Sequence, residues 1–314
     1  MYDKVKLWLD RSSVSGEFST IVDNLSKAVE QTDRQTGETK VFGSLEGLKV
    51  SIYANGISII GSLPKYMYAS NVYPLDRHTT KEALTKISDT LHTDVSRADV
   101  TGLEFGTVLL LSHRVESYLQ RLGETPKLQR VHFEDGTLYY RSKSRLQPKT
   151  LAFYDKVAEC KHGGVEMPTG LEGQNLLKYE LRLNRRLPKQ LNVREVKAAT
   201  LTDREFYKAL MQRWQNAYFS ISKQKQVKTD VMSEIKTVSD AFNVFVARLM
   251  ANANKDVVSG FIDELKDAKV FENRNYYDRL KKKIQAISET ADVTVTDELI
   301  KELDNAVKNS GAYL

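Results

Sequence analysis

The first two-thirds of the chain alternate apolar and polar side chains, which is the pattern of strands that bury one face. This alternation predicts strands at residues 5–9, 48–53, 57–60, 96–100, 107–111, 129–134, 137–140, 151–157 and 176–183. The dipeptides Asn55-Gly56 and Asp135-Gly136 each separate two of these strands, which favours tight hairpins of the I′ type. Amphipathic helical spacing at 81–91 and 113–122 interrupts the strands. We therefore expect an α+β fold with an antiparallel sheet and flanking helices.

The pattern changes close to residue 200. From there apolar residues such as Phe206, Leu210 and Trp214 recur at helical spacing, and later segments continue in the same style. We expect an all-helical C-terminal region. The change of pattern predicts two domains, residues 1–198 and 199–314, with no Pro- or Gly-rich linker between them.

Composition places the chain among soluble globular proteins, because 41% of its 314 residues are hydrophobic and 28% are charged. No apolar run approaches the roughly 18–20 residues that span a bilayer, and the first residues lack the apolar core of a signal peptide. The single cysteine, Cys160, excludes an internal disulfide and a cysteine-based zinc site. A cytoplasmic protein without membrane contact is expected.

The basic residues are unevenly placed, although the net charge of +6 is modest for this length. They gather just before the strand predicted at 151–157 and at the end of the strand predicted at 176–183. The members of this basic set are Arg141, Lys143, Arg145, Lys149, Arg182, Arg185 and Arg186. Their clustering indicates an anionic partner, although each one alone is equally typical of a solvated charged face.

Two of the predicted strands carry reactive side chains that a core strand does not need. Alternation puts Tyr154 and Lys156 on one face of the first strand, and Glu180 and Arg182 on one face of the second. In a phosphodiester-cleaving site a tyrosine acts as nucleophile, a carboxylate holds a metal ion and cations hold the phosphate. The plainer interpretation is a sheet whose tyrosine packs and whose carboxylate pairs with arginine.

Several segments, taken in order, resemble those of rolling-circle replication initiators of plasmids and filamentous phages, and in particular the gene II/X type. They extend over residues 60–220 and read Gly61-Ser-Leu-Pro-Lys-Tyr66, Ser96-Arg-Ala-Asp99, Gly136-Thr-Leu-Tyr-Tyr-Arg-Ser142, Phe153-Tyr-Asp-Lys156, Leu176-Leu-Lys-Tyr-Glu-Leu-Arg-Leu-Asn-Arg-Arg186 and Phe206-Tyr…Trp214…Tyr218. The Tyr-Asp-Lys and Tyr-Glu-Leu-Arg segments are specific as a pair.

The resemblance implies a metal-dependent, site-specific single-strand DNA endonuclease and ligase. Such an initiator nicks one strand at the origin, forms a 5′-phosphotyrosine, leaves a free 3′-OH and later religates the strand. Tyr154 matches the nucleophile, and Lys156 is the residue expected to hold the phosphate or to lower the tyrosine pKa. Residues 1–198 are then the nicking domain.

The implied cofactor is Mg²⁺ or Mn²⁺, with Glu180 and Asp99 at the family's acidic positions. The chain departs from the family at Leu103, where a second acidic residue is usual. Glu104 comes one position later, on the opposite face from Asp99, and reaches the site only if a bulge near Gly102 turns it.

A histidine pair of the kind used by related tyrosine nucleases is lacking in this sequence. His132 and Glu134 are two potential ligands on one strand face, but a plain cross-strand pair of His132 with Tyr139 is the favoured interpretation.

The DNA contacts implied by the resemblance combine the basic set along the backbone with Tyr139 and Tyr140 stacked on unpaired bases. Origin DNA, single-stranded or as a hairpin, is the expected partner in the bacterial cytoplasm. Residues 199–314 are expected to serve DNA recognition, dimerisation or contact with a host helicase, with the host polymerase as a further partner.

Two alternatives stay open. A non-catalytic DNA-binding initiator or regulator would use the same basic surface without turnover. A nuclease of mobilisation or transposition would use the same chemistry on another DNA target.

Overall fold

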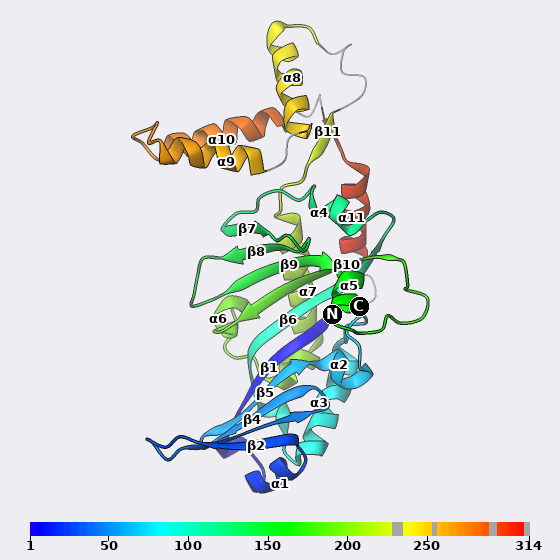
Figure 1. Ribbon diagram of the computed structural model, residues 1–314, viewed down its shortest axis with the longest axis vertical. Coiled ribbons are helices and arrows are strands. Elements are labelled where there is room, and N and C mark those ends of the chain that lie inside the picture. Colours follow the sequence, from blue (N-terminus) through cyan, green and yellow to red (C-terminus); the bar gives the residue numbers. More distant parts are fainter. Residues whose placement is uncertain (228–234, 253–255, 289–293, 311–314) are drawn as a thin grey trace. The chain divides into compact units, whose positions relative to one another are not determined.

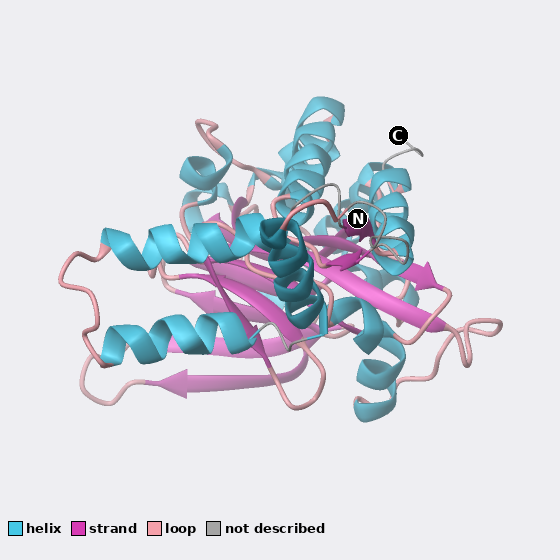
Figure 2. Ribbon diagram, turned by 90° about the horizontal axis from the view of Figure 1, so that it is seen from above, coloured by secondary structure: helices cyan, strands magenta, loops and turns pink. Residues whose placement is uncertain are grey.

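The structure is a computed structural model that describes residues 1–227, 235–252, 256–288 and 294–310 (Figure 1). These residues form two compact units. The first unit consists of the described residues of Met1–Val115, Glu124–Ser220 and Ala306–Leu314, and the second of those of Glu116–Gly123 and Ile221–Asn305. Helices, strands and loops are distinguished by colour in Figure 2.

The first unit is built on a ten-stranded antiparallel sheet. In chain order its strands are β1 (Tyr2–Asp10), β2 (Ser26–Thr32), β3 (Thr39–Leu45), β4 (Leu48–Tyr53), β5 (Gly56–Ser62), β6 (Asp99–Leu111), β7 (Leu128–His132), β8 (Leu138–Ser142), β9 (Lys149–Asp155) and β10 (Asn175–Asn184). Their order in the sheet is β2-β3-β4-β5-β1-β6-β10-β9-β8-β7. The predicted α+β class with an antiparallel sheet is confirmed.

Helices follow or interrupt these strands. They are η1 (Arg11–Ser13), α1 (Phe18–Asp23), α2 (Leu63–Tyr68), α3 (Arg77–Leu91), η2 (Val95–Arg97), α4 (Val115–Leu119), α5 (Lys156–His162), α6 (Leu187–Leu191), η3 (Ala198–Thr202) and α7 (Arg204–Phe219). The two long helices begin at aspartates, Asp76 for α3 and Asp203 for α7, whose side chains accept hydrogen bonds from the first-turn N–H groups.

One face of the sheet packs against α7 and forms the core of the first unit. Tyr179 on β10 stacks on Trp214 of α7, with ring centroids 4.6 Å apart, and its hydroxyl donates to the Trp214 carbonyl. Phe105 of β6 meets Tyr207 of the same helix edge to face. Because side chains alternate along a strand, the residues between these ones point to the other face, which we call the polar face.

Several predicted strands have different limits in the structure, and two of these differences concern candidate site residues. Of residues 96–100 only the last two are in a strand, because η2 occupies Val95–Arg97 and β6 starts at Asp99. The strand predicted at 151–157 ends at Asp155, because the Asp155 carboxylate caps α5 by accepting bonds from the N–H groups of Val157 and Ala158.

Both predicted hairpins form, but neither is a two-residue I′ turn. At the β7–β8 hairpin the Gly136 N–H donates to Phe133 and the Phe133 N–H to Thr137, with Gly136 at φ +81°. This longer turn pairs Val131 with Tyr139. Between β4 and β5 the turn residues Ala54 and Asn55 both have negative φ, whereas I′ needs positive values.

The second unit is helical apart from one short strand pair. It contains α8 (Val238–Asn252), α9 (Asp256–Asp267), α10 (Asn275–Ser288) and most of α11 (Glu298–Asn309), with β11 (Lys225–Val227) paired to β12 (Thr294–Thr296). The prediction of an all-helical C-terminal region is therefore corrected by this strand pair. The Arg121 guanidinium, 2.7 Å from the Asp297 carboxylate, ties residues 116–123 to the start of α11.

The predicted limit between residues 198 and 199 lies within the first unit, because α7 packs on the sheet. The roles assigned to the two predicted domains stay predictions. No helix in the described part of the chain has the length and apolar character needed to cross a membrane.

Candidate functional site

A tyrosine and a glutamate from neighbouring strands meet on the polar face. β9 and β10 pair so that Tyr154 lies opposite Lys178, and Ala152 lies opposite Glu180. The small side chain of Ala152 leaves room in front of Glu180, and the Tyr154 hydroxyl donates to Glu180 Oε1 at 3.0 Å. Glu180 is only 1% exposed, whereas Tyr154 is half-buried. The sheet therefore holds a phenol against a buried carboxylate.

Arg182 lies between two carboxylates on the same face. Its Nε and Nη2 donate to Glu180 Oε2 at 2.9 and 2.7 Å, and its Nε is 3.9 Å from Glu104 Oε2. Glu104 lies directly opposite Arg182 in the β6–β10 pair. Glu180 therefore links Tyr154 to Arg182, and Arg182 in turn lies next to Glu104.

An irregularity in β6 puts Glu104 at this place. The pairing of β1 with β6 changes register between Lys6–Gly102 and Leu7–Val100, which leaves Thr101 as an extra residue. A bulge of this kind shifts the alternation by one residue. The condition that the sequence set for Glu104 is thus met.

Asp99 is far from Glu180, and the predicted pairing of these two residues as metal ligands is corrected. Gly106 is the β6 residue opposite Glu180, and Asp99 lies seven residues before it. At about 3.3 Å per residue the separation is roughly 20 Å. The Asp99 carboxylate instead pairs with Lys197 Nζ at 2.6 Å.

A second correction concerns Lys156, which was expected beside Tyr154 on one strand face. It is the first residue of α5, its side chain is fully buried, and its Nζ donates to Asn71 Oδ1 at 2.8 Å and to Glu159. The lysine next to the tyrosine is Lys178, whose Nζ lies 3.8 Å from Glu180 Oε1.

Lys178 belongs to a buried ion pair that the sequence reasoning did not identify. Its Nζ lies 3.0 Å from Asp3 Oδ2, and both side chains are almost without exposed surface. Ser62 and Asn71 also donate to the Asp3 carboxylate. In the sequence, the signal that could have revealed it was Asp3 itself, a carboxylate within the alternating pattern at the start of the chain.

The charges around the site shift several pKa values. Burial raises the pKa of Tyr154 well above its ordinary value, and the neighbouring Glu180 charge raises it further. Burial also raises the pKa of Glu104, outweighing Arg182. For Arg182, burial alone would lower the pKa, but Glu180 and Glu104 outweigh it and raise the pKa. The Tyr154 phenol is therefore protonated in the resting site.

Some of the predicted DNA contacts lie on the polar face. Tyr139 and Arg141 alternate on β8, opposite Ala152 and Thr150. The guanidinium of Arg141 is 4.6 Å from the centre of the Tyr139 ring, and that of Arg182 is 5.7 Å from it. One aromatic ring and two cations thus adjoin the Tyr154–Glu180 pair.

Two other predicted DNA contacts point away from the polar face and are corrected. Tyr140 is fully buried and packs edge to face on Phe153, so it is unable to stack on a base. Lys149 lies opposite Leu183 on the core face, where burial and the nearby charge of Arg213 lower its pKa. Both are adjacent in sequence to residues of the polar face, and strand alternation separates them.

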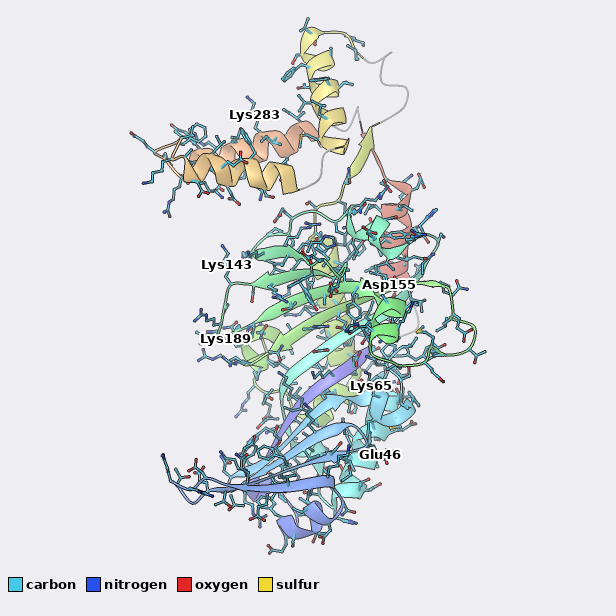
Figure 3. The ribbon with its side chains drawn as sticks, in the orientation of Figure 1. Glu46, Lys65, Lys143, Asp155, Lys189 and Lys283 are labelled. Atoms are coloured by element: carbon cyan, nitrogen blue, oxygen red, sulfur yellow. The ribbon has the colours of Figure 1, made fainter. Side chains whose placement is uncertain are left out.

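The remaining basic residues lie at one end of the strands. Lys143 and Arg145 are exposed in the β8–β9 loop, and Arg185 and Arg186 are exposed after β10. Figure 3 shows Lys143 and Lys189 on the same side of the sheet, opposite the end that bears Asp155. We call Lys143, Arg145, Arg185 and Arg186 the basic rim, which lies at the end of the strands away from Asp155.

His132 and Glu134 do not form a ligand pair. His132 lies opposite Leu138, not Tyr139 as expected, and both His132 and Glu134 are exposed around the hairpin. Across the described residues, no group of three or more His, Cys, Asp or Glu side chains is placed to hold a metal ion. The carboxylates of Glu104 and Glu180 both lie next to Arg182. Because Mg²⁺ keeps several waters and needs few protein ligands, two such donors are compatible with a hard divalent cation.

Comparison with known protein families gives a match over more than half of the chain. Residues 1–202 match a family model that describes the N-terminal region of the phage replication-associated protein of gene II. The match covers the complete ten-stranded sheet, both of its faces and the Tyr154–Glu180 pair. No curated protein matches the sequence.

Proposed function

The chain belongs to the family of phage replication-associated proteins of the gene II type, and on that premise we propose that it nicks one strand of origin DNA through a tyrosine nucleophile. Family membership supports the role of replication initiator. The observation that carries the chemistry is the hydrogen bond from the Tyr154 hydroxyl to Glu180.

In the proposed reaction the Tyr154 oxygen attacks the scissile phosphorus, and the bond from phosphorus to the 3′ oxygen breaks. The products are a 5′-phosphotyrosine and a 3′-OH. The phenol proton passes to Glu180 and from there to solvent, and the 3′ oxygen takes a proton from water, so that no net proton is gained or lost. Attack by a 3′-OH on the phosphotyrosine reverses these steps and reseals the strand.

The neighbouring residues support this assignment. A phenol with a raised pKa is a poor nucleophile by itself, so a carboxylate already accepting its hydrogen bond is the required base. Arg182, which donates to Glu180, would offset the phosphate charge. Glu104 and Glu180 are the residues proposed to hold Mg²⁺ or Mn²⁺, which when bound would polarise the phosphate.

The remaining parts of the proposal concern partners. The polar face, with Tyr139 and Arg141, and the basic rim fit single-stranded origin DNA or a hairpin. On α8 the side chains of Phe242, Phe245 and Leu249 are more than half exposed, which supports contact with a host helicase, a polymerase or a second copy. Such an initiator would work in the bacterial cytoplasm.

The test is covalent capture on labelled single-stranded origin DNA. Wild type with Mg²⁺ or Mn²⁺ should give an adduct on a denaturing gel, and EDTA or Tyr154→Phe should abolish it. Tyr139→Phe is the matched control, because Tyr139 is a tyrosine on the same face and should be dispensable for the adduct. An adduct lost only in Tyr139→Phe would move the nucleophile, whereas origin binding without any adduct would refute nicking.

One observation favours a second function, that of a non-catalytic origin-binding initiator. Glu180 already receives bonds from Tyr154 and Arg182, and Lys178 lies near, so the cluster is also satisfied as a structural element. In that case binding is indifferent to EDTA and Tyr154→Phe changes stability alone.

A further inference from the structure

The two halves of the large sheet have the same topology. Strands β1 to β5 lie in the order β2-β3-β4-β5-β1, and strands β6 to β10 in the order β7-β8-β9-β10-β6. The first strand of each half lies at the centre, where β1 and β6 pair antiparallel. In both halves the fifth strand leads to a short helix and then to a long helix capped by an aspartate.

Sequence and strand pairing align the halves in the same way. The short helices α2 and α6 both begin with Leu-Pro-Lys, at Leu63 and Leu187. This match makes Ser58 equivalent to Arg182. Because Ser58 pairs with Trp8 and Arg182 pairs with Glu104, Trp8 is equivalent to Glu104.

Lys6 lies two residues before Trp8 on β1, and Gly102 lies two residues before Glu104 on β6. The same alignment therefore makes Lys6 equivalent to Gly102. These two residues pair with each other in the sheet. If a two-fold axis relates the two halves, it passes between β1 and β6, and at that point a residue pairs with its own equivalent. The pairing of Lys6 with Gly102 meets this condition and so supports the alignment independently. The sheet is an internal duplicate.

The N-terminal copy lacks the charged cluster of the other half. Trp8 stands in place of Glu104, Ser58 in place of Arg182 and, by the same offset, Gly56 in place of Glu180. The carboxylates and the guanidinium are therefore absent at these positions. The copy therefore lacks the groups proposed for nicking.

Aromatic side chains and lysines occupy the polar face of that copy instead. The β-pairing aligns Phe42, Ser51, Ser58 and Trp8 in one row across four strands. Tyr53 lies diagonally next to Trp8, with ring centroids 5.9 Å apart. The Phe42, Tyr53 and Trp8 side chains are half-buried, so part of each ring faces solvent.

The lysines of this face supply positive charge. Lys40 Nζ is 5.9 Å from the centre of the Tyr53 ring, and Lys6 and Lys49 flank the aromatic row. Two carboxylates near Trp8 have partners: Asp10 accepts the Trp8 Nε1–H at 2.9 Å, and Asp99, opposite Trp8 in the sheet, pairs with Lys197. The charge of the face fits a polyanion.

We propose that the N-terminal half of the sheet binds single-stranded DNA, with bases stacked on Trp8, Tyr53 and Phe42 and the backbone held by Lys6, Lys40 and Lys49. Duplex DNA has its bases stacked internally and offers no face to such a row, whereas single strands do. The proposal rests on the proposed function for the identity of the ligand as DNA. It does not depend on nicking.

Tryptophan emission reports on this face directly. The chain has two tryptophans, and Trp214 has no exposed surface. Titration with oligo(dT) of about 20 nucleotides should quench wild-type emission saturably, since stacked bases quench indole. The quenching should vanish in Trp8→Phe, which retains only Trp214.

Binding constants complete the test. By fluorescence anisotropy of a labelled oligo(dT), Trp8→Ala should weaken binding about 10-fold. Tyr73→Ala is the matched control, because Tyr73 is an exposed aromatic residue outside the sheet, and it should bind as wild type. Unfolding curves of both variants exclude a loss of fold.

The outcomes separate this proposal from the nicking chemistry. Trp8-dependent quenching without any adduct keeps the single-strand surface and refutes nicking. An adduct with unchanged Trp8 emission, or with equal affinities of Trp8→Ala and Tyr73→Ala, overturns the surface and keeps nicking. Equal quenching by duplex DNA would also overturn it, because stacking on unpaired bases would not be the cause.

Discussion

The Tyr154 hydroxyl donates a hydrogen bond to Glu180 Oε1 at 3.0 Å, although the two residues are diagonal neighbours and not directly opposed across β9 and β10. The residue opposite Glu180 is Ala152, and its small side chain lets the phenol reach across. This contact is the centre of the proposed reaction, so variants around it give direct tests.

Glu180→Gln should slow adduct formation by a factor of about 10²–10⁴, because the amide still accepts the Tyr154 hydrogen bond but takes up no proton. The measurement is the single-turnover rate on single-stranded origin DNA. Glu134→Gln, an exposed change on the β7–β8 hairpin, serves as the control. Equal rates for wild type and Glu180→Gln would contradict the role of proton acceptor.

Glu104→Gln should raise the Mn²⁺ concentration needed for half-maximal nicking at least about 10-fold, because a ligand is lost. Asp99→Asn should leave that concentration unchanged, since Asp99 lies seven residues from the position opposite Glu180 and pairs with Lys197. Metal titrations of both variants decide the question. If Asp99→Asn needed more Mn²⁺ and Glu104→Gln did not, Asp99 would be the ligand and Glu104 would not.

Asp3→Asn should destabilise the fold by about 3–5 kcal/mol, because it leaves the Lys178 ammonium buried without its partner. Urea unfolding measures the change. The double variant Asp3→Asn/Lys178→Met should recover part of the loss, since the uncompensated charge is then gone. Asp263→Asn, in an exposed pair with Lys266, is the control and should have no measurable effect. A double variant no more stable than Asp3→Asn would argue against the pair.

The same pair predicts an acid limb of the stability curve. Burial alone would raise the pKa of Asp3, but Lys178 outweighs it and holds the pKa below its ordinary value. The stabilisation is therefore present above the unfolded-state pKa of about 4 and is lost as the pH falls through the folded-state value. Urea unfolding at a series of acid pH values should show a steeper decline for wild type than for Asp3→Asn. Parallel curves would remove Asp3 from the titration.

Arg141→Ala should weaken single-strand binding and reduce the slope of log K against log salt by about 0.7, which corresponds to one phosphate contact. Lys149→Ala should leave the slope unchanged, because Lys149 lies on the core face beside Leu183. Anisotropy titrations at several salt concentrations provide the slopes. If both variants changed the slope equally, the assignment of the two faces would fail.

Local pattern was sufficient for much of the sheet. The alternation at 48–53 matches β4 residue for residue, and the segments around Tyr154 and Glu180 were placed on strands, which pair with each other in the structure. β2 escaped prediction because all of its residues, Ser26–Thr32, are exposed, so no burial pattern marks them. Such an edge strand is specified by pairing with its neighbour.

By itself the sequence determined the class of the fold, the family, and the residue types that suit phosphodiester chemistry, because these depend on local periodicity and short motifs. Only the tertiary structure decided which of these residues meet. The irregularity at Thr101 brings Glu104 to the site, and the register of β6 on β10 leaves Asp99 remote. The cap at Asp155 ends β9 and withdraws Lys156, so that Lys178 is the lysine near Tyr154. Strand register and bulges arise from non-local pairing, and a one-residue shift changes the face of every side chain.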